Sequence, residues 1–205
     1  MLSLRQFGAH LKTAKTPLIF GVLLFAVGIA LGMMNAEALQ QVVIGQIEGL
    51  RETSQRLAKN PNPEFSFFLF IFFNNAIKGV LMIYLGMFAG IIPALFLIIN
   101  GMVLGYLIEL QSVQGASIAD LVFRGLLPHG IIEIPAIIIA SAIGMKFGLI
   151  SLRRLGGALT GRSDREQGEW RQFFRSTLNV SFWIVILLFI AAIIESTLTF
   201  HLMKS

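Results

Sequence analysis

Long runs of apolar residues alternate with shorter polar stretches along the chain. The apolar runs cover residues 17–34, 65–110, 126–150 and 180–200, and they contain few charged side chains. A hydrocarbon core of about 30 Å needs roughly 20 helical residues, so three of these runs suit one transmembrane helix each. The run over 65–110 is too long for a single crossing and must contain a turn.

The turn is expected near the middle of that long run. Gly86 and Gly90 loosen the backbone there, and Pro93 is tolerated in the first turn of a following helix. The long run then divides into two spans, over about 65–86 and 91–110. The pattern therefore predicts an all-α membrane bundle with five transmembrane helices.

The polar stretch over residues 36–59 carries apolar side chains at helical spacing. This pattern predicts an amphipathic helix outside the bilayer, ended by the Asn-Pro-Asn-Pro sequence at 60–63. The apolar face of this helix either covers the outer ends of the spans or docks a partner protein. The candidates for docking are Val43, Ile47, Leu50 and Leu57.

The connection over residues 151–178 has a different character, because arginines and aromatic residues are interspersed in it. Such a juxtamembrane mixture is typical of an interfacial helix that rests on anionic lipid. We therefore expect a cytoplasmic interfacial helix here. No feature of the chain suggests a nucleic-acid partner.

The composition agrees with a single integral membrane domain over residues 1–205. Hydrophobic residues make up 56% of the chain and charged residues only 13%, and the mean hydropathy is +0.79. These values lie outside the usual range of a soluble domain, and the lipid bilayer is the first expected partner. Cysteine is absent from the sequence, which excludes disulfides and zinc sites built on thiolates.

Lys and Arg are distributed unequally between the two sides of the predicted bundle. The segment before the first span and the connection over 151–178 fall on one side and carry most of these residues. The positive-inside rule then predicts a multi-pass protein of the cell membrane with a cytoplasmic N-terminus and an external C-terminus. A cleaved signal peptide is the alternative for the first apolar run, and we disfavour it because the run is longer than a usual h-region.

Eight glycines of the predicted spans form four pairs with i, i+4 spacing. Small residues at this spacing let helix backbones approach closely, either within one chain or between copies. We therefore expect tight helix packing, and a homodimer as one way of using these faces. The glycines are Gly28, Gly32, Gly86, Gly90, Gly101, Gly105, Gly144 and Gly148.

Several polar side chains interrupt the apolar runs, where they are costly unless they face the bundle interior or a water-filled cavity. A rise of 1.5 Å per residue puts most of them in one layer in the outer half of the membrane. Glu109 and Glu195 fall close to the external ends of their spans and are expected to reach water. The polar intramembrane candidates are Asn74, Asn75, Lys78, Asn100, His129 and Glu133.

His129 and Glu133 lie one helical turn apart and thus on one helix face, with Pro135 predicted to bend the helix just beyond them. They suit either a polar network that holds the helices together or a polar cavity for a small ligand, an ion or a proton. A metal site has less support, because no HExxH motif and no second internal histidine are present. We expect no cofactor and no bound metal.

Four sequence elements occur here in a characteristic order: Asn74-Asn75, Gly86 with Gly90, Asn100-Gly101, and Pro128-His129-Gly130 followed by Glu133. This ordered set resembles the stage II sporulation protein M family. The resemblance implies a polytopic membrane protein of bacteria or archaea. In spore formers, the family's namesake resembles an anchor for two cell-wall-degrading proteins, although relatives also occur in organisms that do not sporulate. No catalytic residue is implied.

Three functions remain open at this point. The first is a non-enzymatic membrane scaffold that recruits cell-envelope or peptidoglycan-remodelling proteins through its external helix and the external connection over residues 109–125. The second is a transporter or channel-like protein whose polar layer binds a solute or an ion. The third, with the least support, is a membrane-embedded metal-dependent hydrolase.

Overall fold

A computed structural model describes residues 2–114, 127–160 and 163–202 of the chain. In these ranges the chain forms seven α-helices and no strands. Five of the helices are long and apolar enough to cross a membrane. The predicted all-α fold with five candidate transmembrane helices is therefore confirmed.

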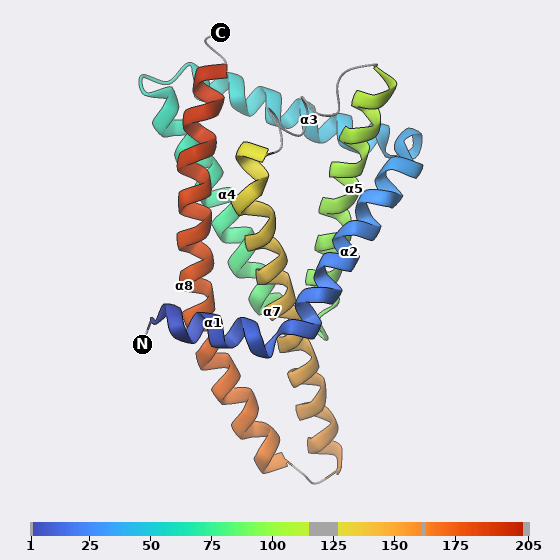
Figure 1. Ribbon diagram of the computed structural model, residues 1–205, viewed down its shortest axis with the longest axis vertical. Coiled ribbons are helices and arrows are strands. Elements are labelled where there is room, and N and C mark those ends of the chain that lie inside the picture. Colours follow the sequence, from blue (N-terminus) through green and yellow to red (C-terminus); the bar gives the residue numbers. More distant parts are fainter. Residues whose placement is uncertain (1, 115–126, 161–162, 203–205) are drawn as a thin grey trace.

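The five long helices follow the predicted spans closely at most of their ends. They are α2 (Lys15–Met34), α4 (Pro63–Leu85), α5 (Ile91–Val113), α7 (Leu127–Thr160) and α8 (Ser163–Leu202). Two further helices, α1 (Leu4–Thr13) and α3 (Ala36–Ala58), lie across the bundle at its opposite ends (Figure 1). We refer to these two ends as the α1 side and the α3 side.

The long helices form two groups. Helix α2 packs along α5, while α4, α7 and α8 pack against one another. Helix α7 also contacts both α2 and α5, and Figure 1 shows the two groups converging toward the α1 side. On the α3 side the groups diverge, and α3 crosses from one group to the other because it contacts α5 at one end and α4 at the other.

The turn between α4 and α5 forms where the glycines predicted it. Helix α4 ends at Leu85 and α5 begins at Ile91, with Ala89 and Gly90 both in the left-handed region at φ 57° and 74°. Glycine adopts this conformation without a steric penalty, whereas Ala89 adopts it at some cost. Pro93 lies buried in the first turn of α5, where its missing N–H is not needed.

Residues 151–178 do not form the separate interfacial helix that we expected. Helix α7 continues to Thr160 and α8 begins at Ser163, so the two helices project beyond α1 as an antiparallel hairpin (Figure 1). Trp170 explains why, since its ring lies 5.8 Å from that of Phe147 and its indole N–H donates to the hydroxyl of Ser151 at 3.3 Å. Trp170 and Phe173 thus pack between the two helices, whereas Phe174 remains partly exposed.

Helix α1 is an element that the sequence analysis did not predict. Leu4, Phe7 and Leu11 recur at spacings of three and four residues, and Phe7 is buried against the ring of Trp183 on α8, 6.2 Å away. The basic residues of the segment lie elsewhere on the helix. Such a short amphipathic helix at the end of a bundle is typical of the membrane interface.

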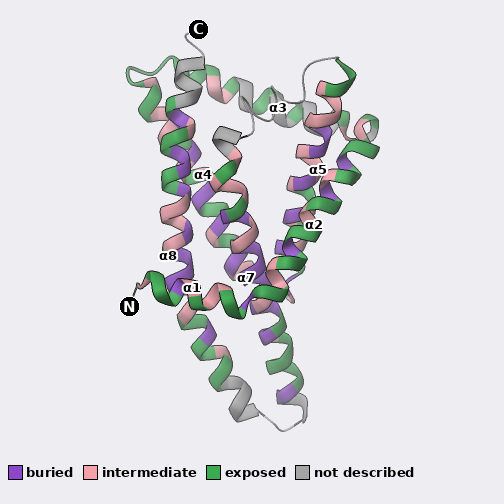
Figure 2. Ribbon diagram, in the orientation of Figure 1, coloured by how far each residue is buried: buried purple, intermediate pink, exposed green. Residues whose placement is uncertain are grey.

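The buried residues concentrate on the faces where α4, α7 and α8 meet (Figure 2). Phe147, Ile143 and Leu188 are almost fully buried there. Apolar side chains on the outer faces are exposed instead, for example Ile19 and Leu23 on α2 at 64% and 56%. Exposed apolar faces on long helices are expected where lipid is the solvent.

Candidate functional site

Three polar side chains from three different helices meet inside the bundle. Glu133 on α7 lies beside Glu195 on α8 and Asn75 on α4, close enough for side-chain hydrogen bonds to join the three. Asn75 is buried, and both glutamates are half-buried. We call Asn75, Glu133 and Glu195 the carboxyl cluster.

The carboxyl cluster has a definite chemical requirement. A carboxylate only accepts hydrogen bonds, so a bond between two carboxyl groups needs a proton on one of them. The cluster can therefore hold a proton between Glu133 and Glu195, with the Asn75 amide as a further partner. Carboxyl groups at such a position either fix helices to one another or bind a proton or a cation.

Two neighbours on α4 extend the carboxyl cluster. The Asn74 amide donates to the Asn75 side-chain oxygen at 3.1 Å. Lys78, one turn further along α4, is exposed, yet its charge acts on Glu133. The structure thus brings Asn74, Asn75 and Glu133 together and places Lys78 at their edge.

Among the sequence candidates whose side chains are described, Asn100 is not joined to the carboxyl cluster. Asn100 lies on α5, in the other helix group, and its amide donates at 2.7 Å to the carbonyl of Phe96 in its own helix. Shared depth therefore did not bring Asn100 to the carboxylates. His129 falls in the first turn of α7, but its side chain lies outside the described residues, so its pairing with Glu133 stays a prediction.

Glu195 is the member of the cluster that the sequence analysis missed. We expected it to mark a water-facing end of the last span, but the structure directs it toward Glu133. An acidic residue that follows the apolar run Ile184–Ile194 without a break was the available signal. Glu195 was assigned to the water-facing end of the helix because charged residues at such positions usually reach water.

The glycine pairs of α2 and α5 face each other. A side chain at Gly28 or Gly32 would overlap the backbone of Ile98 or Met102, and one at Gly101 or Gly105 would overlap the backbone of Phe25 or Ile29. All four glycines are buried. The absence of side chains is what allows α2 and α5 to lie in backbone contact.

The other two glycine pairs join the α4–α5 turn to α7. A side chain at Gly86 would overlap the backbone of Gly144, and one at Gly148 would overlap Gly90 and its neighbour Ala89. All eight predicted glycines thus meet backbone or side chains of their own chain. Because these faces are filled within the monomer, they provide no argument for a homodimer.

The docking candidates on α3 have different environments. Leu57 packs at the start of α4 against the buried cluster of Phe67, Ile71 and Ala192, so it is engaged within the chain. The side chains of Val43, Ile47 and Leu50 lie outside the described residues, although their backbone belongs to α3. Only Leu57 of this set can therefore be placed, and it anchors α3.

The described residues form no cluster typical of a metal site. Among the described residues, no three His, Asp or Glu side chains come together. The carboxyl cluster supplies two carboxylates and an amide instead, with Lys78 as the nearby positive charge. The metal-dependent hydrolase stays a prediction from the sequence.

Comparison with known proteins gave one finding. A family model described as stage II sporulation protein M matches residues 21–200, which include the carboxyl cluster, the whole of α4, α5 and α7, and most of α2 and α8. No curated protein and no solved structure matched. The chain therefore belongs to the stage II sporulation protein M family.

Proposed function

We propose that this protein is a non-enzymatic membrane anchor that recruits a cell-envelope or peptidoglycan-remodelling protein through helix α3. The observation that carries the proposal is the position of α3. This helix crosses the α3 side of the bundle and joins the two diverging helix groups (Figure 1). A helix that lies outside the spans and is held at both ends is a suitable surface for a partner.

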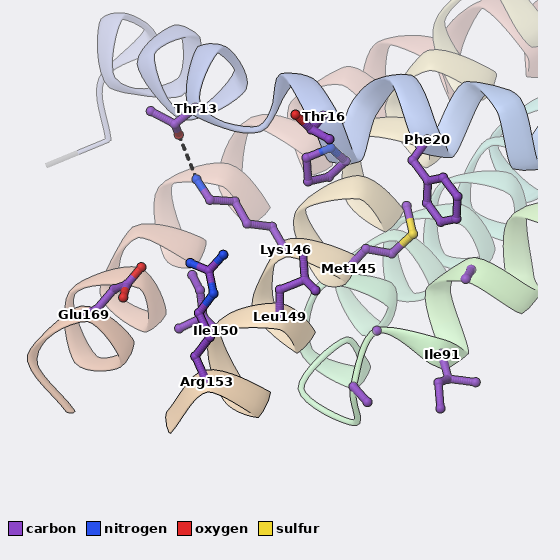
Figure 3. Close-up of a pocket in the computed structure, with 14 residues that line it drawn as sticks. Thr13, Thr16, Phe20, Ile91, Met145, Lys146, Leu149, Ile150, Arg153 and Glu169 are labelled. Carbon is purple, nitrogen blue, oxygen red and sulfur yellow. Dashed lines mark hydrogen bonds between the residues drawn. The ribbon is translucent and has the colours of Figure 1, made fainter. Parts of the chain in front are cut away.

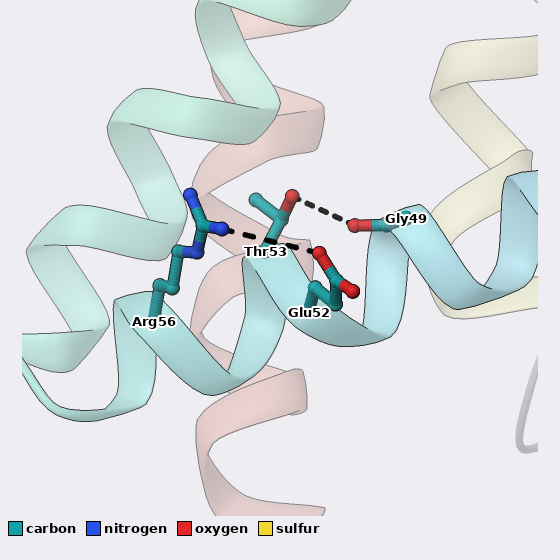
Figure 4. A network of polar contacts seen from close by, with 4 residues as sticks. All are labelled: Gly49, Glu52, Thr53 and Arg56. Carbon is teal, nitrogen blue, oxygen red and sulfur yellow. Dashed lines mark hydrogen bonds and ion pairs between the residues drawn. The ribbon is translucent and has the colours of Figure 1, made fainter.

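The composition of α3 suits an external position. Glu52 and Arg56 are 73% and 83% exposed and lie 3.9 Å apart across one helical turn (Figure 4). Between them, Thr53 donates its hydroxyl hydrogen to the carbonyl of Gly49 at 2.8 Å. Such an exposed pair contributes little to stability, so this face of α3 serves mainly to keep the helix in water.

The other face of α3 supplies the proposed contact. Leu57 anchors the C-terminal end of the helix on α4, while Val43, Ile47 and Leu50 follow at helical spacing toward the middle. Apolar residues at this spacing form the anchor positions by which an amphipathic helix packs into a groove. We assign these three residues to the partner and Leu57 to the fold.

Capture by the detergent-solubilised protein tests this assignment. Replacing Val43, Ile47 and Leu50 by serine should abolish co-purification of peptidoglycan-cleaving activity, because the anchor residues are lost. The matched control replaces Glu48 and Glu52 by glutamine on the exposed face, and it should capture as much activity as the unaltered chain. Both variants should unfold at the same temperature. Undiminished capture by the serine variant would remove α3 as the docking element.

The carboxyl cluster favours a second candidate function, an intramembrane site for a proton or a cation. Glu133 and Glu195 can share a proton, and Lys78 gives them a positive neighbour. Flux measured in liposomes should then depend on pH and be lost in Glu133→Gln. The matched control is Asn100→Leu, which removes a polar group that bonds only within α5. If liposomes with either variant showed the same flux as empty liposomes, the carboxyl cluster would be assigned a structural role.

A further inference from the structure

A cavity of about 640 Å³ lies on the α1 side of the bundle, away from both α3 and the carboxyl cluster. It lies between the starts of α2 and α5 and the middle of α7 (Figure 3). Its polar side chains gather at one end, and Phe20, Met145 and Ile91 line the other. The volume falls within the range of about 300–1,000 Å³ that is usual for ligand sites.

The polar end of the cavity carries a net positive charge. Lys146 and Arg153 both line it, and Glu169 is the one acidic residue among the lining side chains. The Lys146 ammonium donates to the Thr13 hydroxyl at 2.8 Å and lies 5.3 Å from the centre of the Phe173 ring. In the part of the chain whose side chains are described, neither cation forms a close salt bridge, although the charge of Glu169 acts on Lys146 from a longer distance.

These contacts leave Lys146 with unused binding capacity. An ammonium has three N–H donors, and Thr13 takes only one of them. A half-buried cation without a close ion partner is costly, and an anionic ligand would offset that cost. Arg153 lies about two helical turns further along α7 and adds a planar guanidinium suited to phosphate oxygens.

The apolar end of the cavity faces the region that lipid occupies. Phe20 on α2 is 51% exposed, Ile91 on α5 is 59% exposed, and Leu149 on α7 is 50% exposed. These residues belong to candidate membrane spans and would lie against acyl chains in a bilayer. A purely inorganic anion would leave this wall unused, whereas a lipid would cover it.

The depth of the cavity matches the boundary of the bilayer. Helix α2 begins at Lys15, so Phe20 lies roughly 8 Å into the span at 1.5 Å per residue. Thr13 ends α1, the amphipathic helix across this end of the bundle. The cavity thus spans from the headgroup level into the acyl region, which is the position of a bound phospholipid.

We propose that this cavity binds one anionic phospholipid, with its phosphate on Lys146 and Arg153 and an acyl chain along Phe20, Ile91 and Leu149. The bound lipid would tie α1 and the start of α2 to α7. The positive charge selects an anionic headgroup, and the apolar wall selects a lipid over free phosphate.

Native mass spectrometry of the full chain in detergent tests the proposal. Phosphatidylglycerol should bind as a single adduct more tightly than phosphatidylcholine. Replacing Lys146 and Arg153 by glutamine should weaken the binding of phosphatidylglycerol about thirtyfold, because each basic residue near an anionic lipid contributes about fivefold to the affinity. The matched control replaces Arg154 and Arg171 by glutamine, which removes the same charge from residues that do not line the cavity.

Both double variants should elute and unfold like the unaltered chain, so that a change in lipid binding reports on the cavity. A selective loss in the Lys146 and Arg153 variant supports the site. Equal losses in the two double variants would indicate a diffuse surface charge and overturn it, as would no loss in either. Displacement of phosphatidylglycerol by excess inorganic phosphate would show an anion site and overturn the assignment to lipid.

Discussion

The close contact between α2 and α5 gives a sharp prediction for Gly28→Ala. A methyl group at Gly28 would lie 3.0 Å from the Cα of Gly101 and would overlap the carbonyl of Ile98. Carbon atoms prefer separations of about 3.5–4.0 Å, so the two helices must move apart by about 0.5–1 Å. Such a gap loses about a quarter to a half of the dispersion energy of the atoms along that face.

The expected loss in the free energy of unfolding follows from two opposing effects. Overpacking of a close interface costs about 1–3 kcal/mol, and replacing glycine by alanine inside a helix returns about 0.5–1 kcal/mol. We therefore expect Gly28→Ala to destabilise the bundle by about 1 kcal/mol, within a range of about 0–2.5 kcal/mol. The double variant with Gly101→Ala should cost less than the sum of the single changes, because both widen the same interface.

Two matched glycines serve as controls. A methyl group at Gly21 would meet the flexible end of Leu97 at 3.3 Å, and one at Gly49 on α3 would meet nothing within 4 Å. Gly21→Ala should therefore cost little, and Gly49→Ala should be neutral or stabilising by up to about 1 kcal/mol. The assay is reversible unfolding in mixed micelles, with the oligomeric state measured in parallel. If Gly28→Ala unfolds like Gly49→Ala but changes the oligomeric state, the glycine face joins two copies and our reasoning fails.

Three further predictions concern other parts of the chain. Burial and the charge of Lys146 lower the pKa of His10 from its usual 6.5. Because the unfolded chain then binds the proton more readily than the folded chain, the stability of the fold should decrease as the pH drops below about 6.5. An NMR titration that gives His10 a pKa at or above 6.5 would refute this prediction. Trp170→Ala should weaken the α7–α8 hairpin by about 1–3 kcal/mol, seen as faster hydrogen exchange at its end, while the exposed Arg171→Ala should leave exchange unchanged. Glu195→Leu should destabilise the bundle by about 1–2 kcal/mol, and Glu195→Gln should destabilise it less, because only the glutamine side chain can still form a hydrogen bond. If both variants were equally stable, the carboxyl cluster would have no role in helix packing.

The local pattern of apolar residues was sufficient to predict the five spans and α3. Apolar length placed all five spans, and amphipathic spacing with the Asn-Pro-Asn-Pro stop placed α3 over Ala36–Ala58, close to the predicted 36–59. Both signals are local, since they depend on the bilayer thickness and on helix geometry. The sequence of helix α1 has the same kind of apolar spacing at Leu4, Phe7 and Leu11. This segment is short and directly precedes the first long span, so its pattern was overlooked.

The sequence-based predictions that were wrong concern contacts between residues far apart in the chain. Trp170 and Phe147 pack against each other across the hairpin, and neither position shows by itself that an aromatic residue faces protein instead of lipid. Asn100 and Glu195 show the same limit, because helical rise gives the depth of a side chain but not the neighbour toward which it points. The carboxyl cluster therefore required the arrangement of α4, α7 and α8.

The central claim is that α3 presents a docking face to a cell-envelope partner, and site-specific crosslinking in intact cells tests it most directly. The chain contains no cysteine, so a photoreactive maleimide attached to Ile47→Cys reports on that position alone. We predict a crosslink from this position to a peptidoglycan-cleaving protein, and none from the exposed control Arg171→Cys, which belongs to the part of α8 that forms the hairpin on the α1 side. Crosslinks from Ile47→Cys only to lipid, or only to a second copy of the chain, would contradict the account.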